Sequence, residues 1–141
     1  PQVAASAAIV DALSGSLCVV EVAADFTTAA WRKLLQNAVA GLMVLTGRRA
    51  GMYARGDIAA LALAYATECL TVARAEGAAL GDEVADEIVA TFHRMPADMS
   101  TSILADREAG RPLEWQVRNG VVQRLGRAHG IPTPVSDLVV P

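Results

Sequence analysis

The chain has 141 residues, enough for one domain with a hydrophobic core, and apolar residues make up 53% of it while aromatic residues contribute only 4%. Such a core has to be built from alanine, leucine and valine, which favours closely packed helices. The net charge of −3 and the sequence pI of about 5.3 argue against a nucleic-acid-binding surface.

Cysteines, histidines and apolar runs narrow the class of protein further. Cys18 and Cys69 are far apart and form no CxxC motif, which fits a reducing compartment, so we predict a cytoplasmic protein. His93 and His129 lack metal-ligand spacing to cysteine or carboxylate, and we expect no metal site. The longest apolar runs, such as residues 59–66, are too short to span a bilayer. We therefore expect neither a membrane nor a nucleic acid as a partner.

The first 23 residues differ in pattern from the rest of the chain. Residues 3–14 predict a helix that ends at Gly15, and residues 17–22 predict one short, β-branched strand. A single helix and a single strand cannot make a sheet, and the sequence does not begin with Met. We interpret residues 1–23 as the last elements of an α/β domain that lies upstream.

From residue 24 onward the pattern predicts only helices, so the expected fold class is all-α. Asp25, Thr27 and Thr28 are N-cap candidates for a helix that runs to about Thr46. The segment 47–56 contains three arginines and is interpreted as an exposed loop, with a phosphate clamp for a cofactor as the alternative. Further helices are predicted at 58–76 after an Asp57 cap, at 82–95, at 100–110, at 112–129 after Pro112, and beyond the turn at 131–134.

Lys33 and Asn37 form a polar pair on the first long helix. They lie four residues apart and therefore share a face, whereas their neighbours are apolar almost all round. A polar pair on such a helix either faces a cleft or costs several kcal/mol in lost hydration. The alternative is a solvated lysine beside an asparagine.

Further polar candidates lie in the segment 102–120. Glu114 falls in the first turn of the helix predicted after Pro112, where the helix dipole stabilises a carboxylate and Arg118 could pair with it. Ser102 could cap its helix or face solvent. Spacing alone thus predicts an α-helical domain with a polar site at Lys33 and Asn37.

Two segments together carry a resemblance to a known family, WRKLLQN (31–37) and MSTSILADREAGRPLEWQVRNGVVQRLGRAHGIPTP (99–134). They are similar to the C-terminal domain of the 2-dehydropantoate 2-reductases, also called ketopantoate reductases. The family pattern is W-x-K-L-x-x-N, followed further along by S-S-M-x-x-D-x-x-x-G-R-x-T-E-x-x-x-x-N-G and then G-x-x-x-P. The order, the gap and nearly all of residues 25–134 match.

The resemblance implies an oxidoreductase of pantothenate biosynthesis that reduces a small 2-oxo acid with NADPH. In this family an N-terminal Rossmann domain binds most of the cofactor. Residues 1–23 would then be the end of that domain, and residues 24–141 a helical domain of the 6-phosphogluconate dehydrogenase-like type that forms one wall of the catalytic cleft. This part alone would be inactive, and its partners would be the Rossmann domain and, as a further candidate, a second copy in a homodimer.

The resemblance also implies roles for single residues. Lys33 matches the lysine that acts as general acid, and Asn37 and Ser102 match residues that bind the substrate. Glu114 matches the glutamate that reaches into the cleft near the cofactor. These types suit the chemistry, because an ammonium beside a carbonyl oxygen can stabilise the charge that hydride transfer leaves there and then protonate it.

The chain departs from the family pattern at several positions, and where the family has TSSM, residues 100–103 are STSI. Gly41 and Gly51 stand where asparagines that line the substrate site are expected, and Leu113 replaces the threonine before Glu114. Fewer hydrogen-bond partners would weaken discrimination for a polar substrate. We therefore expect a wider or less polar site and a 2-oxo acid other than ketopantoate.

Two other functions remain open on the sequence. One is a non-catalytic helical module, derived from the family, that serves oligomerisation or ligand binding. The other is a reductase of imines or other ketones built on a similar plan, since a lysine near a carboxylate does not distinguish the two. A glycine-rich dinucleotide motif upstream would favour a reductase over the non-catalytic module.

Overall fold

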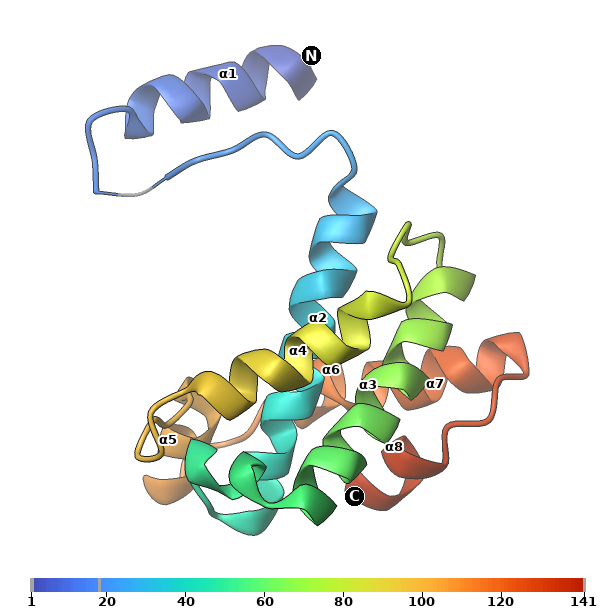
Figure 1. Cartoon of the computed structure of the whole chain (residues 1–141). Helices are drawn as coiled ribbons and strands as arrows, with labels where there is room; N and C mark the ends of the chain where they lie inside the picture. The colour runs from blue at the N-terminus through green and yellow to red at the C-terminus, as the bar shows by residue number, and fades with distance from the viewer. Residues whose placement is uncertain (1, 18, 141) are drawn as a thin grey trace.

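The computed structural model describes residues 2–17 and 19–140, and every regular element in those ranges is a helix. Helix α1, Gln2–Leu13, matches its prediction and stands apart from the other helices (Figure 1). The predicted strand is wrong where it can be examined, because residues 19–22 have no regular structure and Cys18 lies outside the described residues. A strand needs a neighbouring strand to receive its backbone hydrogen bonds, and the described ranges contain none.

Helix α2, Phe26–Thr46, begins at one of the predicted caps. Asp25 Oδ1 accepts a hydrogen bond from the Thr28 amide at 3.0 Å, and Oδ2 accepts one from the Thr28 hydroxyl at 2.6 Å. The hydroxyl and then the amide of Thr28 hold the pKa of the Asp25 carboxyl below its usual value. The helix ends at Gly47, whose φ of 64° lies in the left-handed region that glycine favours.

The arginine-containing segment and the start of the next helix differ from the prediction. A short 3₁₀ helix, η1 (Ala50–Ala54), forms inside the expected loop. Helix α3, Gly56–Ala75, has Arg55 at its N-cap position, so the predicted cap at Asp57 is wrong. Asp57 lies instead in the first turn, where the helix dipole favours a carboxylate, and pairs with Arg55 at 2.7 Å.

Helix α3 is the central helix of the domain and contacts η1, α2, α4, α7 and α8. Among the described residues it is the one helix long and apolar enough, by length and composition, to cross a membrane. The run at 59–66 is part of this longer apolar helix, and the expectation that no membrane is a partner stays a prediction. The most apolar stretch of α3 is 44% buried inside the domain, and a helix enclosed by neighbouring helices needs the same composition.

Two short connections bring α4 (Glu83–Arg94) and α5 (Ser102–Glu108) against α2, close to their predicted bounds. In Figure 1, α4 runs across α2 toward α5, so that the three helices meet near the lower end of α4. This meeting point encloses the face of α2 that carries the predicted polar pair.

The predicted continuous helix at 112–129 is wrong. The chain forms α6 (Trp115–Arg118) and α7 (Gly120–His129), and Pro112 precedes both. The break falls at Asn119, whose buried side chain turns inward to bond with α2 and α3. A short final helix, α8 (Pro134–Val139), packs on α3 and α7.

Candidate active site

A hollow of about 160 Å³ lies where α2, α4 and the start of α5 meet; we call it the Lys33 hollow. Four of its residues come from α2 at spacings of three and four, so they share one helical face. The other four come from α4, the turn after it and the cap of α5. The lining residues are Lys33, Gln36, Asn37, Ala40, Thr91, Phe92, Met95 and Thr101.

Lys33 is exposed at this hollow and forms no ion pair within residues 2–17 and 19–140. Its neighbour Arg32, by contrast, pairs with Glu87 at 2.6 Å. Of the 12 lysine and arginine residues in the sequence, Lys33 is the only lysine. A guanidinium stays protonated in proteins, whereas an ammonium can give up its proton. Among the lysine and arginine side chains, the one able to do so therefore lies at this hollow.

Asn37 is half-buried in the same hollow, as the shared helical face predicted. Its amide forms no hydrogen bond within the part of the chain that the structure describes. Lys33 and Asn37 thus present a cation and an amide that the fold itself does not occupy, and both can bind a ligand.

Ser102 lies beside the hollow rather than in its lining. Thr101 is the N-cap of α5, where its hydroxyl accepts from the Leu104 amide at 3.4 Å, and Thr101 also lines the hollow. Ser102 follows as the first, exposed residue of α5. Its hydroxyl is not the cap, so the role of Ser102 in substrate binding stays a prediction.

Glu114 lies outside the Lys33 hollow. It occupies the N-cap position of α6 without a side-chain cap bond, and its side chain is 70% exposed. The carboxylate pairs with Arg118 at 3.5 Å, the i,i+4 contact that the sequence suggested. The structure therefore brings Lys33 and Asn37 together and leaves Glu114 facing solvent.

Gly41 and Gly51 do not line the Lys33 hollow, and packing explains both glycines. A Cβ at Gly41 would lie 2.6 Å from Asn119 Nδ2. A Cβ at Gly51 would lie 3.0 Å from the Cβ of Ala97, whose carbonyl accepts from the Gly51 amide at 2.9 Å. Neither glycine therefore bears on the polarity of this hollow, and the expectation of a wider or less polar substrate site stays a prediction.

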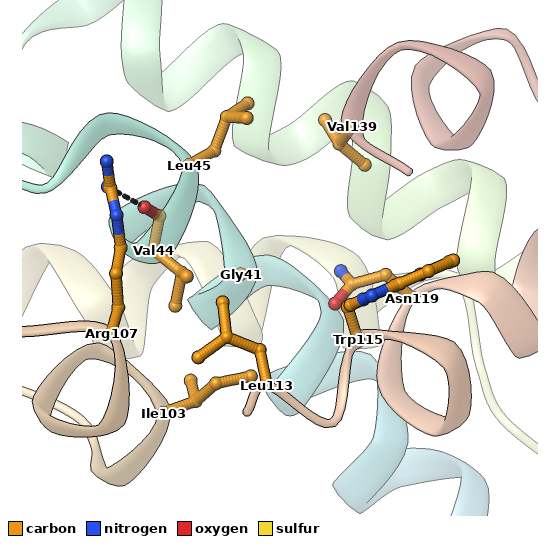
Figure 2. A pocket seen from close by; sticks show the side chains of 9 residues that line it. All are labelled: Gly41, Val44, Leu45, Ile103, Arg107, Leu113, Trp115, Asn119 and Val139. Atoms are coloured by element: carbon orange, nitrogen blue, oxygen red, sulfur yellow. Dashed lines mark hydrogen bonds between the residues drawn. The ribbon is translucent and has the colours of Figure 1, made fainter. Parts of the chain in front are cut away.

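A second hollow, of about 250 Å³, is lined by residues of α2, α5, α6 and α8 (Figure 2). We call it the Asn119 hollow. Figure 2 shows Leu113 and Ile103 beside each other below Gly41, with Arg107 at one end hydrogen-bonded to the Val44 carbonyl. The lining residues are Gly41, Val44, Leu45, Ile103, Arg107, Leu113, Trp115, Asn119 and Val139. The substitution at Leu113 thus contributes to this apolar hollow rather than to the Lys33 hollow.

Buried polar groups around α3 form a set that the sequence prediction missed. Asn119 Nδ2 donates to the Ala38 carbonyl at 3.0 Å and to the Tyr65 hydroxyl at 2.9 Å. Glu68 accepts from the Val135 amide at 2.8 Å and from the Ser136 amide and hydroxyl at 2.9 and 2.5 Å. We call Asn119, Tyr65, Glu68 and Ser136 the buried polar set. The one sequence signal for it was Glu68, a carboxylate inside an apolar helix.

The remaining candidates have structural partners. Arg49, from the suspected phosphate clamp, donates to the Asp98 carbonyl at 3.2 Å and pairs with Glu108 at 3.3 Å. Cys69 is a buried free thiol, and burial raises its pKa well above the ordinary value. His93 Nδ1 lies 3.3 Å from the Tyr53 carbonyl. The Lys33 hollow, which contains the predicted pair Lys33 and Asn37, is therefore the candidate active site.

Comparison with known proteins identifies the family of this chain. The family model for the C-terminal domain of ketopantoate reductase, PanE/ApbA, matches residues 25–140. A 2-dehydropantoate 2-reductase of Mycobacterium tuberculosis is 60% identical over 129 residues, which are 92% of this chain and 44% of the relative. One of Caulobacter vibrioides is 40% identical over 116 residues, 82% of this chain and 40% of the relative.

Solved structures agree with the sequence comparison. The dimeric ketopantoate reductase of Staphylococcus aureus superposes with a TM-score of 0.90 at 26% identity, over 96% of this chain and 48% of that one. The fold is thus that of the helical domain of this solved structure. The chain belongs to the ketopantoate reductase family and corresponds to its C-terminal domain. It spans less than half the length of these relatives.

Proposed function

We propose that this chain is the substrate-side domain of an NADPH-dependent 2-oxo acid reductase resembling 2-dehydropantoate 2-reductase. The observation that carries the proposal is Lys33, the sole lysine, which lies unpaired among the described residues one turn from an uncommitted amide at Asn37. Family membership supports it. A place in pantothenate biosynthesis and a cytoplasmic location follow from the same proposal.

The residues of this chain suit one half of a cleft. Complete ligand pockets usually measure roughly 300–1,000 Å³, and the Lys33 hollow is smaller than that at about 160 Å³. A second wall from another domain would complete it. Glu114, which lies outside the hollow and is exposed, has a carboxylate that could accept a hydrogen bond from a cofactor hydroxyl. When bound, NADPH supplies the hydride.

Lys33 then provides the proton. Hydride addition to the 2-oxo carbon breaks the carbonyl π bond and leaves the electron pair on oxygen. The Lys33 ammonium stabilises this charge and donates one proton, which forms the hydroxyl of the product and leaves a neutral amine. The amine regains a proton from solvent. Asn37 and Ser102 orient the substrate through hydrogen bonds.

We also propose that residues 1–23 belong to a Rossmann domain. Apolar side chains in this segment are exposed, including Ile9 at 57%, Val19 at 90% and Val22 at 63%. Further elements of such a domain would cover them. The 141-residue chain should therefore show no NADPH binding at micromolar concentrations in calorimetry, and sub-micromolar binding would contradict the missing-domain proposal.

Lys33→Ala in the full-length enzyme tests the function. We expect kcat to fall about 10²-fold or more, the scale of positioned acid catalysis, with little change in NADPH affinity. Lys33→Arg should not restore turnover, because a guanidinium keeps its proton. Arg94→Ala, which removes an exposed cation from α4 outside the hollow lining, is the matched control and should leave kcat unchanged. Near-normal turnover of Lys33→Ala would refute the mechanism.

A further inference from the structure

The Asn119 hollow is a second space in the fold to which the proposed function gives no role. It shares no lining residue with the Lys33 hollow. Its volume of about 250 Å³ is close to the lower end of the roughly 300–1,000 Å³ range of ligand pockets. Figure 2 shows Arg107 at one end of this hollow and the Asn119 amide at the other. The hollow is therefore large enough for a small molecule and has a different polar group at each end.

The first end carries a guanidinium without an ionic partner. Arg107 donates one N–H to the Val44 carbonyl and forms no ion pair within residues 2–17 and 19–140. The two carboxylates of α5, Asp106 and Glu108, pair with other arginines. Because a guanidinium has five N–H donors, most of those of Arg107 stay available. This end of the hollow therefore suits an anionic group.

The other end holds a buried amide with an unused acceptor. Asn119 is only 5% exposed, and its Nδ2 makes the two structural bonds to Ala38 and Tyr65. Its Oδ1 accepts no hydrogen bond from the part of the chain that the structure describes. Every side-chain nitrogen or oxygen fully enclosed in that part has a partner. Oδ1 must therefore reach the open space of the hollow that Asn119 lines, where a ligand can donate to it.

The wall between the two ends is apolar. Figure 2 shows Val44, Ile103 and Leu113 between Arg107 and the Asn119 amide. Removing such side chains from water is favourable, whereas a polar group placed against them would lose its hydration without a partner. The middle of a ligand in this hollow is therefore expected to be a hydrocarbon chain.

Two glycines of the α2 region give the distance that such a chain has to span. A Cβ at Gly41 would lie 3.0 Å from Asn119 Oδ1, and a Cβ at Gly47 would lie 3.1 Å from Arg107 Nη1. The two glycines are six residues apart along α2 and its C-cap. At a rise of about 1.5 Å per residue, the two polar groups are roughly 9 Å apart along the helix axis.

We propose that the Asn119 hollow is a binding site for a small ionised carboxylic acid. The carboxylate pairs with the Arg107 guanidinium, the short apolar chain lies along α2, and a hydrogen-bond donor at the far end binds Asn119 Oδ1. An arginine suits this partner because its N–H groups can hold both oxygens of a carboxylate. The site is separate from the candidate active site, and the inference does not depend on the proposed function.

Three related probes test the two polar ends. 6-Hydroxyhexanoate carries both groups on an unbranched chain, hexanoate lacks the hydroxyl, and 1,6-hexanediol lacks the carboxylate. In calorimetry on the full-length enzyme we expect 6-hydroxyhexanoate to bind with a Kd of about 1 mM or below. Hexanoate should bind about 5- to 10-fold more weakly and the diol about 10- to 100-fold more weakly, because a hydrogen bond to a charged group contributes more than one between neutral groups.

Variants of the lining locate the bound probe. Leu113→Trp puts a larger side chain into the hollow and should weaken 6-hydroxyhexanoate more than about 10-fold. Arg107→Met should weaken it to the level of the diol and leave the diol unchanged, and Arg107→Lys should restore part of the affinity. Arg94→Met, at an exposed arginine of α4 outside this hollow, is the matched control and should change nothing. Lys33→Met should also leave the Kd unchanged. Circular dichroism shows whether each variant is folded.

Three results would overturn the inference. Binding that is lost in Lys33→Met but kept in Leu113→Trp would place the probe in the Lys33 hollow. Equal affinities of 6-hydroxyhexanoate and hexanoate would remove the role of Asn119 Oδ1, and an unchanged Kd in Arg107→Met would remove that of the guanidinium. No binding at about 10 mM would show that the hollow takes no such acid. Sedimentation of the wild type would then show whether a second copy covers it.

Discussion

The buried polar set and the Lys33 hollow contain similar side chains in opposite circumstances. In the buried polar set, Asn119 and Glu68 together make five hydrogen bonds to other helices or to their starts. In the Lys33 hollow, the amides of Gln36 and Asn37 make none among the described residues.

This difference distinguishes polar side chains that stabilise the fold from polar side chains that bind a ligand. A buried polar group is retained for the fold when its partners are other parts of the fold, since each unmade bond there costs about 1–3 kcal/mol. A partly exposed polar group without such partners adds little stability, so its presence points to a ligand. Substitutions in the buried polar set should therefore lower the stability of the fold. Substitutions in the Lys33 hollow should instead lower turnover and leave stability almost unchanged.

The largest stability effect is expected at Glu68. Glu68→Ala leaves the Val135 amide and both donors of Ser136 without their acceptor, which detaches the start of α8 from α3. We expect the free energy of unfolding to fall by roughly 2–5 kcal/mol, measured by urea denaturation of this chain. Glu83→Ala, at an exposed first-turn position of α4, should cost below about 1 kcal/mol. Equal losses at the two sites would remove the special role of Glu68.

Asn119 in the buried polar set and Asn37 in the Lys33 hollow allow the same substitution to be compared in the two regions. Asn119→Ala removes hydrogen bonds to the Ala38 carbonyl and the Tyr65 hydroxyl and should cost about 2–4 kcal/mol. Asn37→Ala should stay within about 0.5 kcal/mol of the wild type. Combining Asn119→Ala with Tyr65→Phe should cost less than the sum of the single changes, because the two share one bond. A destabilised Asn37→Ala would show that the hollow is part of the structural framework.

Gly41 should show an intermediate effect that depends on Asn119. The added methyl group of Gly41→Ala would lie 2.6 Å from Asn119 Nδ2, so one of the two must move. We expect a loss of about 1–3 kcal/mol in the wild-type background. In the Asn119→Ala background the loss should shrink to below about 1 kcal/mol. An unchanged loss there would show that something other than the amide limits the space.

Local spacing predicted most of the fold. The Asp25 cap and the apolar periodicity located α2, and similar signals placed α1, α4, α5 and α8. The strand at 17–22 failed in its described part because pairing decides whether a strand forms, and the sequence around it contains no partner. The helix at 112–129 failed because the side chain of Asn119 turns inward, which interrupts a helix whose local pattern is continuous.

The same limit applies to the site. Lys33 and Asn37 could be predicted because a separation of four residues places them on one face. Asn119 and Glu68 could not, since their partners lie 54 to 81 residues away in the sequence. Gln36 was missed for a third reason. A glutamine on a helix is usually solvated, and only the packing of α4 beside it shows that it faces a hollow.

The smallest stability effect is expected inside the Lys33 hollow. Lys33→Met and Gln36→Met each replace a polar side chain by an apolar one with high helix propensity. Neither change breaks a hydrogen bond or an ion pair among the described residues. We expect the free energy of unfolding to change by less than about 0.5 kcal/mol in either case. The Gln36 amide is uncommitted, so its removal can only relieve a desolvation cost. The free energy of unfolding of Gln36→Met should therefore stay the same or rise.

Urea unfolding of the two methionine variants, run beside Asn119→Ala, measures this directly. The distinction between the two regions is supported if both methionine variants unfold at the same urea concentration as the wild type and Asn119→Ala unfolds at a clearly lower one. A loss above about 1 kcal/mol at Lys33 or Gln36 would place them in the structural framework. Their lack of partners would then no longer indicate a ligand, and a fall in turnover in the same variants could be ascribed to a damaged fold. Stable variants with the predicted loss of turnover would instead assign both side chains to substrate chemistry.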